Sequence, residues 1–337
     1  MKALSIGKIR GLQELSTEHG SLAVLALDQR GSLIKALKID ESDPDLYIKI
    51  REYKMELVGE LLPLCSAVLL DPQFSAAEAI CSSRINGQKG LIVATEETGY
   101  IEQPDGRLNQ VISGWSLGKA KRMGASAAKL LTYYNPEIES MAREQEDFIK
   151  SLVEEAEYLD IPLLLEPMSY SVDPDMPKRS PEFAKKRPRI VQQTAKNLGN
   201  LGVDLLKLEF PCDHNFEKDR SVWQEECNKV TEFAPVPWVL LSAGVDYDVF
   251  RQQLEVACKA GAAGFVAGRA IWKEAAEVTG KERTAFLKGT ARERIKELVD
   301  IVNQHASKWQ DMIESGFCRI DSGWHKDYKD LKHKELS

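Results

Sequence analysis

The sequence predicts an α/β protein of the (β/α)8 class, the TIM barrel, folded as a single domain with a short polar C-terminal tail. Three observations predict it: eight short apolar runs recur along the chain, segments with helical periodicity separate them, and no linker interrupts the series. Near-continuous apolar runs are typical of parallel strands that are buried on both faces. Strands that alternate with helices form either a closed barrel or an open, doubly wound sheet.

The eight predicted strands share one pattern, an apolar run that ends in a polar or small residue. In chain order they are LAVLALD (22–28), AVLLD (67–71), GLIVA (90–94), AAKLL (127–131), PLLLE (162–166), LLKLEF (205–210), WVLLS (238–242) and GFVAG (264–268). Apolar side chains recur at helical spacing over residues 46–61 and again over 141–159. Helices of that length can cross back to the start of the next parallel strand.

The segment after the first strand favours the barrel over the open sheet. It reads Asp28-Gln29-Arg30-Gly31-Ser32, whereas a doubly wound sheet is expected to carry a Gly-x-Gly-x-x-Gly turn there. No change of composition separates Leu22 from Gly268. We therefore predict one barrel domain over residues 1–322 and a Lys/Asp-rich tail over residues 323–337.

Composition narrows the class of protein. The chain has 337 residues, 43% of them hydrophobic and 29% charged, and 45 basic against 52 acidic side chains give a net charge of −7. A disordered chain would be less apolar, and a nucleic-acid-binding protein would usually be basic. No apolar stretch reaches the length that spans a bilayer, and the N-terminus lacks the pattern of a signal peptide. We expect a cytoplasmic protein without nucleic-acid or membrane partners, whose six scattered cysteines are reduced thiols.

Four ionisable residues interrupt or end the apolar strands: Asp28, Lys129, Glu166 and Lys207. The carboxyl ends of the strands carry the active site in this fold, so these side chains are expected to meet at one barrel mouth. A purely structural network of ion pairs is the alternative. It is the less favoured one, because the top layer of a barrel is more easily built from aliphatic residues.

Two lysines beside two carboxylates suit imine chemistry. A lysine amine attacks a ketone only when it is neutral, which an apolar setting and a neighbouring cation promote. Lys207 lies in the apolar run Leu205–Leu208, and Lys129 could supply the cation. The resulting iminium ion accepts electrons when the adjacent carbon–carbon bond breaks, and Glu166 and Asp28 are candidate proton carriers.

Two glycine-containing turns predict a phosphate site. The seventh strand runs into Ser242-Ala243-Gly244-Val245 and the eighth into Gly268-Arg269. The loops after these two strands form the recurrent phosphate site of the barrel fold. Glycines let backbone N–H groups approach phosphate oxygens, Ser242 adds a hydroxyl, and Arg269 adds a charged fork.

Other polar groups near the mouth are candidates for further roles. Arg30, which follows Asp28 closely, is the stronger candidate for a second anionic end of the substrate. The basic stretch that begins at Lys178 is either a solvated face or a further contribution to that end. Only His214 among the five histidines follows a strand, so a metal site is not expected. No cofactor is predicted.

These motifs resemble those of the class I, Schiff-base tagatose-1,6-bisphosphate aldolases. The matching segments span nearly the whole barrel in the same order: 25–31, 69–72, 97–100, 115–116, 129–134, 207–211, 241–245 and 268–272. The resemblance implies that Lys207 forms the imine, Glu166 is its acid/base, Lys129 orients the intermediate and Asp28 handles the hydroxyl proton. It also implies phosphate binding by Ser242, Gly268 and Arg269. Gln29, Arg30 and Gly244 are further predicted substrate-binding residues because of their positions at the barrel mouth.

The substrate remains open among related sugar phosphates. The segments 237–242 and Glu166-Pro167 are also similar to those of sister aldolases that cleave 6-deoxy-6-sulfofructose 1-phosphate. The leading expectation is cleavage of a ketohexose 1,6-bisphosphate, foremost tagatose 1,6-bisphosphate, into dihydroxyacetone phosphate and glyceraldehyde 3-phosphate. Fructose 1,6-bisphosphate is an alternative substrate. A phosphosugar isomerase or epimerase and a non-catalytic sugar-phosphate sensor are alternatives of other classes. The resemblance also implies a homo-oligomer.

Overall fold

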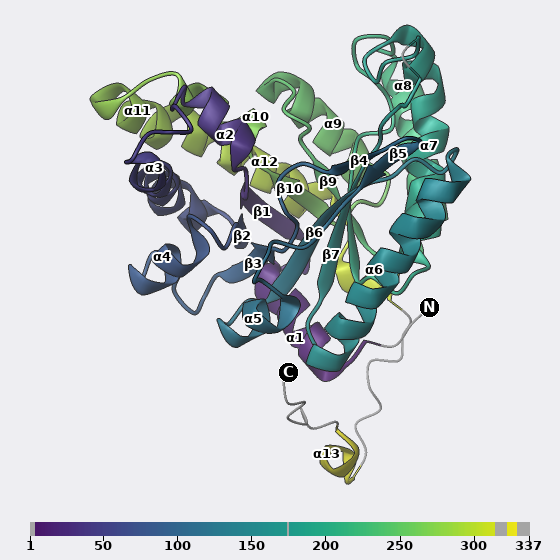
Figure 1. The fold of residues 1–337 in the computed structure, drawn as a ribbon, viewed down its shortest axis with the longest axis horizontal. Helices are drawn as coiled ribbons and strands as arrows, with labels where there is room; N and C mark the ends of the chain where they lie inside the picture. The colour runs from purple at the N-terminus through teal and green to yellow at the C-terminus, as the bar shows by residue number, and fades with distance from the viewer. Residues whose placement is uncertain (1–3, 174, 314–321, 329–337) are drawn as a thin grey trace.

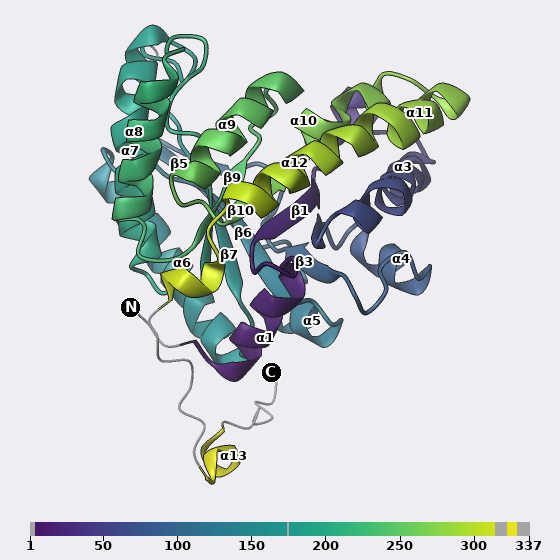
Figure 2. The same cartoon turned by 180° about the vertical axis from the view of Figure 1, so that it is seen from behind.

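Eight parallel strands close into a barrel in the computed structural model, which describes residues 4–173, 175–313 and 322–328 (Figures 1 and 2). Around the ring the order is β1-β10-β9-β8-β7-β6-β3-β2. The strands are β1 (Leu22–Leu27), β2 (Ala67–Leu70), β3 (Gly90–Ala94), β6 (Ala127–Tyr133), β7 (Leu163–Met168), β8 (Leu205–Leu208), β9 (Trp238–Leu241) and β10 (Gly264–Ala267). Each overlaps its predicted run, and the predicted barrel class is confirmed.

Helices surround the barrel because the strands are apolar on both faces. On β1, Leu22, Val24 and Ala26 point into the barrel, whereas Ala23 and Leu25 pack outward against helices. The helices after the first five barrel strands are α2 (Gly31–Ala36) and α3 (Leu46–Leu61), α4 (Ala76–Cys81), α5 (Leu117–Arg122), α6 (Glu139–Leu159) and α7 (Pro181–Gly199). Those that follow are α8 (Arg220–Phe233), α9 (Tyr247–Lys259), α10 (Arg269–Trp272), α11 (Gly280–Phe286) and α12 (Arg292–His305).

Helix α1 (Ile6–Leu15), which the strand pattern did not predict, closes the amino-terminal end of the barrel. Leu12 and Leu15 join the apolar cluster of the barrel interior. The buried Lys8 forms ion pairs with Asp204, at 2.8 Å, and with Glu157, at 2.6 Å. A charged side chain at that depth needs such partners, so Lys8 ties α1 to the segments that precede β7 and β8.

A small antiparallel hairpin lies at the opposite end of the barrel. It consists of β4 (Ile101–Gln103) and β5 (Gly106–Leu108), inserted between β3 and β6. An isolated bridge between Glu96 and Val111 anchors its base. Figure 1 shows the hairpin beyond the ends of β6 and β7.

The sequence also predicts reduced cysteines, a polar C-terminal tail and no segment that spans a bilayer. Cys65, Cys81, Cys212, Cys227 and Cys258 are free, and all but Cys81 are buried; Cys318 lies outside the described residues. The described part of the tail contains one helical turn, α13 (Trp324–Asp327), and residues 329–337 of the predicted tail lie outside the description. Within the described ranges, no helix is long and apolar enough to cross a bilayer.

A fully buried ion pair joins helix α3 to the residue that follows strand β2, and it yields a stability prediction. Lys54 of α3 contacts Asp71, and neither side chain is exposed. Burial lowers the pKa of Lys54, and Asp71 opposes that shift. Lys54→Met leaves the Asp71 charge buried without its partner, so we expect urea denaturation to show a loss of about 3–5 kcal/mol in unfolding free energy.

The double variant Lys54→Met/Asp71→Asn serves as the control, because it removes both charges together. It is expected to recover a large part of the loss. Equal stability of the single variant and the wild type would contradict a structural role for the pair.

Candidate active site

A cavity of about 390 Å³ opens at the carboxyl ends of the strands. Strand alternation explains its lining: Asp28, Lys129, Glu166 and Lys207 each lie two residues beyond an inward-facing apolar residue. Nine of the ten predicted site residues line it: Asp28, Gln29, Arg30, Lys129, Glu166, Lys207, Ser242, Gly268 and Arg269. Residues separated by more than 200 positions thus meet at the predicted barrel mouth.

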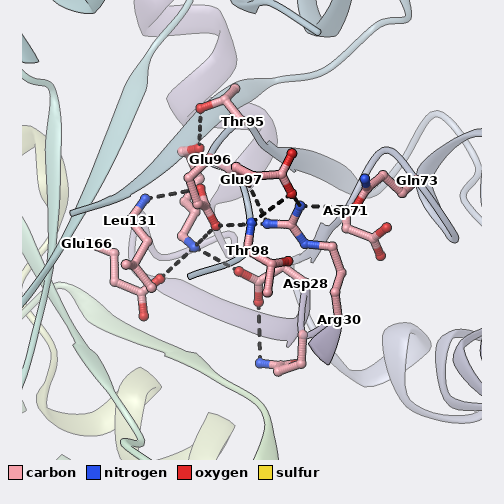
Figure 3. Close-up of polar contacts among 12 residues, drawn as sticks. Asp28, Arg30, Asp71, Gln73, Thr95, Glu96, Glu97, Thr98, Leu131 and Glu166 are labelled. Carbon is pink, nitrogen blue, oxygen red and sulfur yellow. Dashed lines mark hydrogen bonds and ion pairs between the residues drawn. The ribbon is translucent and has the colours of Figure 1, made fainter. Parts of the chain in front are cut away.

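Lys129 lies at the centre of a three-carboxylate cluster, whose members Asp28, Glu96 and Glu166 are labelled in Figure 3. Its Nζ is 2.8 Å from Asp28 Oδ2, 2.6 Å from Glu96 Oε1 and 2.9 Å from Glu166 Oε2. All four side chains are buried. Asp28 and Glu96 accept hydrogen bonds from the ammonium group, and Glu166 adds an ion pair. Three carboxylates thus surround Lys129 and fix it as a charged, immobile centre.

The second lysine shares one of these carboxylates. Lys207 Nζ lies 2.9 Å from Glu166 Oε2, the oxygen that also contacts Lys129. Glu166 therefore bridges the two amines. If Lys207 gives up a proton, Glu166 keeps an ionic partner in Lys129, so the neutral amine does not leave an isolated buried charge behind.

The pKa values follow from the balance between burial and neighbouring charges. Burial disfavours the charged form of Asp28, but Lys129 and Lys207 outweigh it and hold the pKa of Asp28 well below its ordinary value. Burial also acts to lower the pKa of Lys129, but Asp28, Glu166 and Glu96 raise it well above the ordinary value. At neutral pH Asp28 is thus a carboxylate and Lys129 an ammonium ion.

Glu96 is a site residue that the sequence analysis missed. It lies two residues after β3, and besides Lys129 it accepts a hydrogen bond from the Leu131 N–H at 3.0 Å. The neighbouring Thr95 hydroxyl donates to the Lys129 carbonyl at 2.8 Å. The polar triplet Thr95-Glu96-Glu97 at the end of an apolar run was the signal that could have pointed to it.

Arg30 is held among polar groups at the edge of the cavity. Its guanidinium donates to Gln73 Oε1 at 3.0 Å and to the Glu96 carbonyl at 2.5 Å. It also lies 3.9 Å from the Glu96 carboxylate and 3.8 Å from that of Glu97. Figure 3 shows this arrangement. Arg30 thus connects Glu96 to the loop that follows β2, and its charge is balanced by protein carboxylates.

The turn after β9 brings the predicted phosphate residues together. Ala243 and Gly244 have positive φ angles of 48° and 77°, and a Cβ on Gly244 would lie 3.3 Å from Arg269 Cζ. The arginine therefore packs on the turn because residue 244 has no side chain. Gly244 itself lines a neighbouring cavity of about 480 Å³, which shares Arg269, Ala243, Leu241 and Met168 with the first.

The basic stretch after β7 contributes to that neighbouring cavity. Lys178 Nζ lies 2.7 Å from Glu209 Oε1, and Arg187 lies 3.8 Å from the same carboxylate. Burial opposes ionisation of Glu209, but Lys178 and Arg187 lower its pKa to about 2. These two cations thus have a protein counter-ion, so this part of the stretch is not simply a solvated face.

The sequence predicts no role for His214 or Tyr328, and the structure locates both. His214 lines the neighbouring cavity. Tyr328 contacts Asp160, the residue that ends α6 before β7, and so lies toward the opposite end of the barrel from the cavity. Among the described residues, no three His, Cys, Asp or Glu side chains gather into a group that could hold a metal ion.

A protein-family model and curated relatives that are similar to this chain all carry the names of aldolases. The model of the DeoC/LacD aldolase family matches residues 22–274. Tagatose 1,6-diphosphate aldolase 2 of Enterococcus faecalis is 32% identical over 335 residues, covering 93% of this chain and 99% of the relative. A tagatose 1,6-diphosphate aldolase of Listeria monocytogenes is 32% identical over 330 residues, covering 92% and 95%.

Solved structures share the fold at low sequence identity. The fructose-bisphosphate aldolase of Plasmodium falciparum is similar with a TM-score of 0.69 and 15% identity, covering 91% of this chain and 98% of that one. A Schiff-base-forming fructose-1,6-bisphosphate aldolase is similar with a TM-score of 0.57 and 17% identity, covering 88% and 99%. From the family match and the extent of these alignments, the chain belongs to the DeoC/LacD family of aldolases and is a carbon–carbon lyase.

Proposed function

We propose that the protein cleaves a ketohexose 1,6-bisphosphate, foremost tagatose 1,6-bisphosphate, through an imine on Lys207. The single observation that carries this proposal is the pair of amines bridged by Glu166, with Lys207 at the cavity and Lys129 surrounded by three carboxylates. One lysine can therefore act as a nucleophile while the other remains a fixed charge. The names of the curated relatives support the choice of substrate.

Imine formation needs proton transfers at one centre. Lys207 passes a proton to Glu166, attacks the C2 ketone, and forms a carbinolamine after the oxygen is protonated. Glu166, 2.9 Å from Lys207 Nζ, then protonates the departing hydroxyl, and loss of water leaves the iminium ion. Lys129 keeps Glu166 in place through both changes of protonation.

Cleavage follows from the iminium ion. Asp28 removes the proton of the C4 hydroxyl, the C3–C4 bond breaks, and its electron pair moves to the iminium as an enamine forms. Glyceraldehyde 3-phosphate leaves as the aldehyde. Protonation of the enamine at C3 and hydrolysis of the imine release dihydroxyacetone phosphate and restore Lys207. Asp28 suits the first step because it is ionised and lies 2.8 Å from Lys129, which can also stabilise the developing oxyanion.

Trapping the intermediate tests this mechanism. The protein is incubated with dihydroxyacetone phosphate, reduced with borohydride, digested and analysed by mass spectrometry. A reduced three-carbon phosphate adduct on Lys207 is the expected result. If no adduct forms, or if it forms on another lysine, the proposed mechanism is wrong. Rates with tagatose 1,6-bisphosphate, fructose 1,6-bisphosphate and 6-deoxy-6-sulfofructose 1-phosphate then decide the substrate.

Arg269 provides a test of the phosphate site. It lies over the Ser242–Gly244 turn, and no carboxylate lies within ion-pair distance of it in the described part of the chain. Because a charge-assisted hydrogen bond to phosphate contributes about 1.5–3 kcal/mol, Arg269→Ala should raise KM about 10- to 100-fold. The value of kcat should change much less.

Arg143→Ala is the matched control, because this exposed arginine of α6 pairs with Glu139 on the outer surface. Its KM should equal that of the wild type. An unchanged KM for Arg269→Ala would remove Arg269 from the proposed phosphate site.

A further inference from the structure

Arg107, in strand β5 of the hairpin, is enclosed by aromatic rings at the barrel mouth. Its guanidinium carbon lies 4.3 Å from the ring centre of Tyr100, 5.1 Å from that of Tyr170 and 5.3 Å from that of Tyr133. Glu102 is its partner in the hairpin register, but no ion pair forms between them. In the described part of the chain, the charge of Arg107 is therefore stabilised by ring faces instead of by a carboxylate.

The hairpin is held against the barrel by specific contacts. The Arg107 guanidinium packs over the Tyr170 ring, with 5.1 Å to the ring centre, and Asn109 accepts a hydrogen bond from the Tyr133 N–H at 2.8 Å. A Cβ on Gly106 would lie 2.5 Å from the Tyr170 hydroxyl, so the close approach requires glycine at this position. The position of Arg107 is thus determined by the packing of the hairpin on β6 and on the segment after β7.

Tyr133 connects this cluster to the catalytic cavity. It lies on the inward face of β6, two layers beyond Lys129, and lines the cavity together with Thr98 and Gly99. Burial raises the pKa of Tyr133 although Arg107 opposes the shift, so the phenol is protonated at neutral pH. Its hydroxyl has no hydrogen-bond partner among the described residues, and is free to donate to a ligand.

The barrel order places this cluster opposite the proposed phosphate turn. Strand β8, which carries Lys207, lies midway in the series β10-β9-β8-β7-β6. Arg269 follows β10, and Tyr133 ends β6. A substrate bound at C2 to Lys207 with its C1 phosphate at Arg269 would therefore direct its distal carbons toward Tyr133.

Arg30 is less suited to the distal group than its sequence position suggested. Two carboxylates lie 3.9 and 3.8 Å from its guanidinium, and Gln73 and the Glu96 carbonyl occupy two of its donors. A dianion at Arg30 would meet the repulsion of Glu96 and Glu97. Arg107 has no such neighbour within ion-pair distance in the described chain.

We propose that Tyr133 and Arg107 form the subsite for the second anionic group of the substrate, a phosphate or a sulfonate on C6. Tyr133 donates its hydroxyl to this group, and Arg107 positions the ring and supplies the positive field. This inference rests on the proposed aldolase function and identifies the residues that distinguish substrates at their far end.

Aldol addition, the reverse of cleavage, tests the distal subsite separately from the chemistry at Lys207, because the aldehyde can be varied while the donor stays the same. With dihydroxyacetone phosphate as donor, kcat/KM is measured for glyceraldehyde 3-phosphate, for the corresponding three-carbon sulfonate aldehyde and for uncharged glyceraldehyde. Arg107→Gln should lower kcat/KM about 10- to 100-fold for the preferred anionic aldehyde, because the positive field at the distal group is lost and Tyr133 loses the group that positions its ring. For glyceraldehyde it should stay within about twofold.

Two further variants and a control test the separate contributions of the Tyr133 hydroxyl and the Arg107 charge. Tyr133→Phe keeps the ring on Arg107 and should cost roughly tenfold, again only for the anionic aldehydes. Arg107→Lys retains the charge and should recover part of the preference, whereas Arg143→Gln should behave as the wild type.

The possible outcomes separate the two proposals. Equal losses for charged and uncharged aldehydes would show that the hairpin has only a structural role, and unchanged rates would exclude Arg107; either result overturns the subsite while the aldolase function stands. Failure of the wild type with every aldehyde would overturn the proposed function and the subsite together. The better of the two anionic aldehydes identifies the distal group.

Discussion

Lys207→Met is expected to abolish turnover, with a fall in kcat of at least about 10⁴-fold, the scale at which loss of a covalent nucleophile acts. The physical reason is specific to this amine. It lies 2.9 Å from Glu166 at the cavity wall. Lys129 cannot replace it, because Lys129 is held as an ammonium ion by ion pairs with Asp28, Glu96 and Glu166. Steady-state cleavage rates and borohydride trapping both measure the effect.

The variant should remain folded and should still bind phosphate. Glu166 keeps its contact with Lys129, so removal of Lys207 leaves no isolated charge. Lys121→Met is the matched control, since Lys121 donates to the Asp160 carbonyl near the opposite end of the barrel and should be dispensable for turnover. Substantial activity in Lys207→Met would contradict the imine mechanism.

Lys129→Met is expected to impair both stability and activity. Asp28, Glu96 and Glu166 share Lys129 as a partner, and all are buried. Removing one member of a buried ion pair costs about 3–5 kcal/mol, because the remaining charge is not solvated. We expect a loss of that size in the unfolding free energy at pH 7, together with loss of turnover because Glu166 and Asp28 lose their positioning group.

The loss of unfolding free energy in Lys129→Met is expected to become smaller as the pH falls. In the wild type, Lys129 and Lys207 depress the pKa of Asp28 against the effect of burial. This contribution to stability is present above the unfolded pKa of about 3.9 and is lost as the pH falls through the folded value. Without Lys129, less charge opposes the effect of burial on Asp28, so the folded pKa of Asp28 is higher and the folded variant takes up a proton more readily on acidification.

The stability deficit of Lys129→Met should therefore be smaller at pH 5 than at pH 7. Urea denaturation of both proteins at the two pH values measures it. The double variant Lys129→Met/Asp28→Asn, which removes one of the unpaired charges, should be more stable than the single variant at pH 7. A deficit that is independent of pH would show that the carboxylates are not the source of the cost.

Much of the site could be predicted because its residues interrupt strong local patterns. Lys129, Glu166 and Lys207 stand out in apolar strands, and Asp28 ends one. Glu96 was missed because the apolar run ends at Ala94, after which periodicity no longer indicates where a side chain points. Tyr133, which lines the cavity, was not singled out for a related reason: the predicted strand stopped at Leu131, whereas β6 continues through the polar Thr132 to Tyr133.

The sequence by itself determined the barrel, its eight strands and which charged residues lie at their ends, because these depend on periodicities within a few residues. Only the tertiary structure decided how the charges are paired. Closure of the ring places Asp28, Glu96 and Glu166 around Lys129 and leaves Lys207 with one shared carboxylate. It also moves Arg30 into a protein network and brings Arg107 of the hairpin to the mouth. Such contacts join residues far apart in the chain, and no local pattern encodes the distances between them.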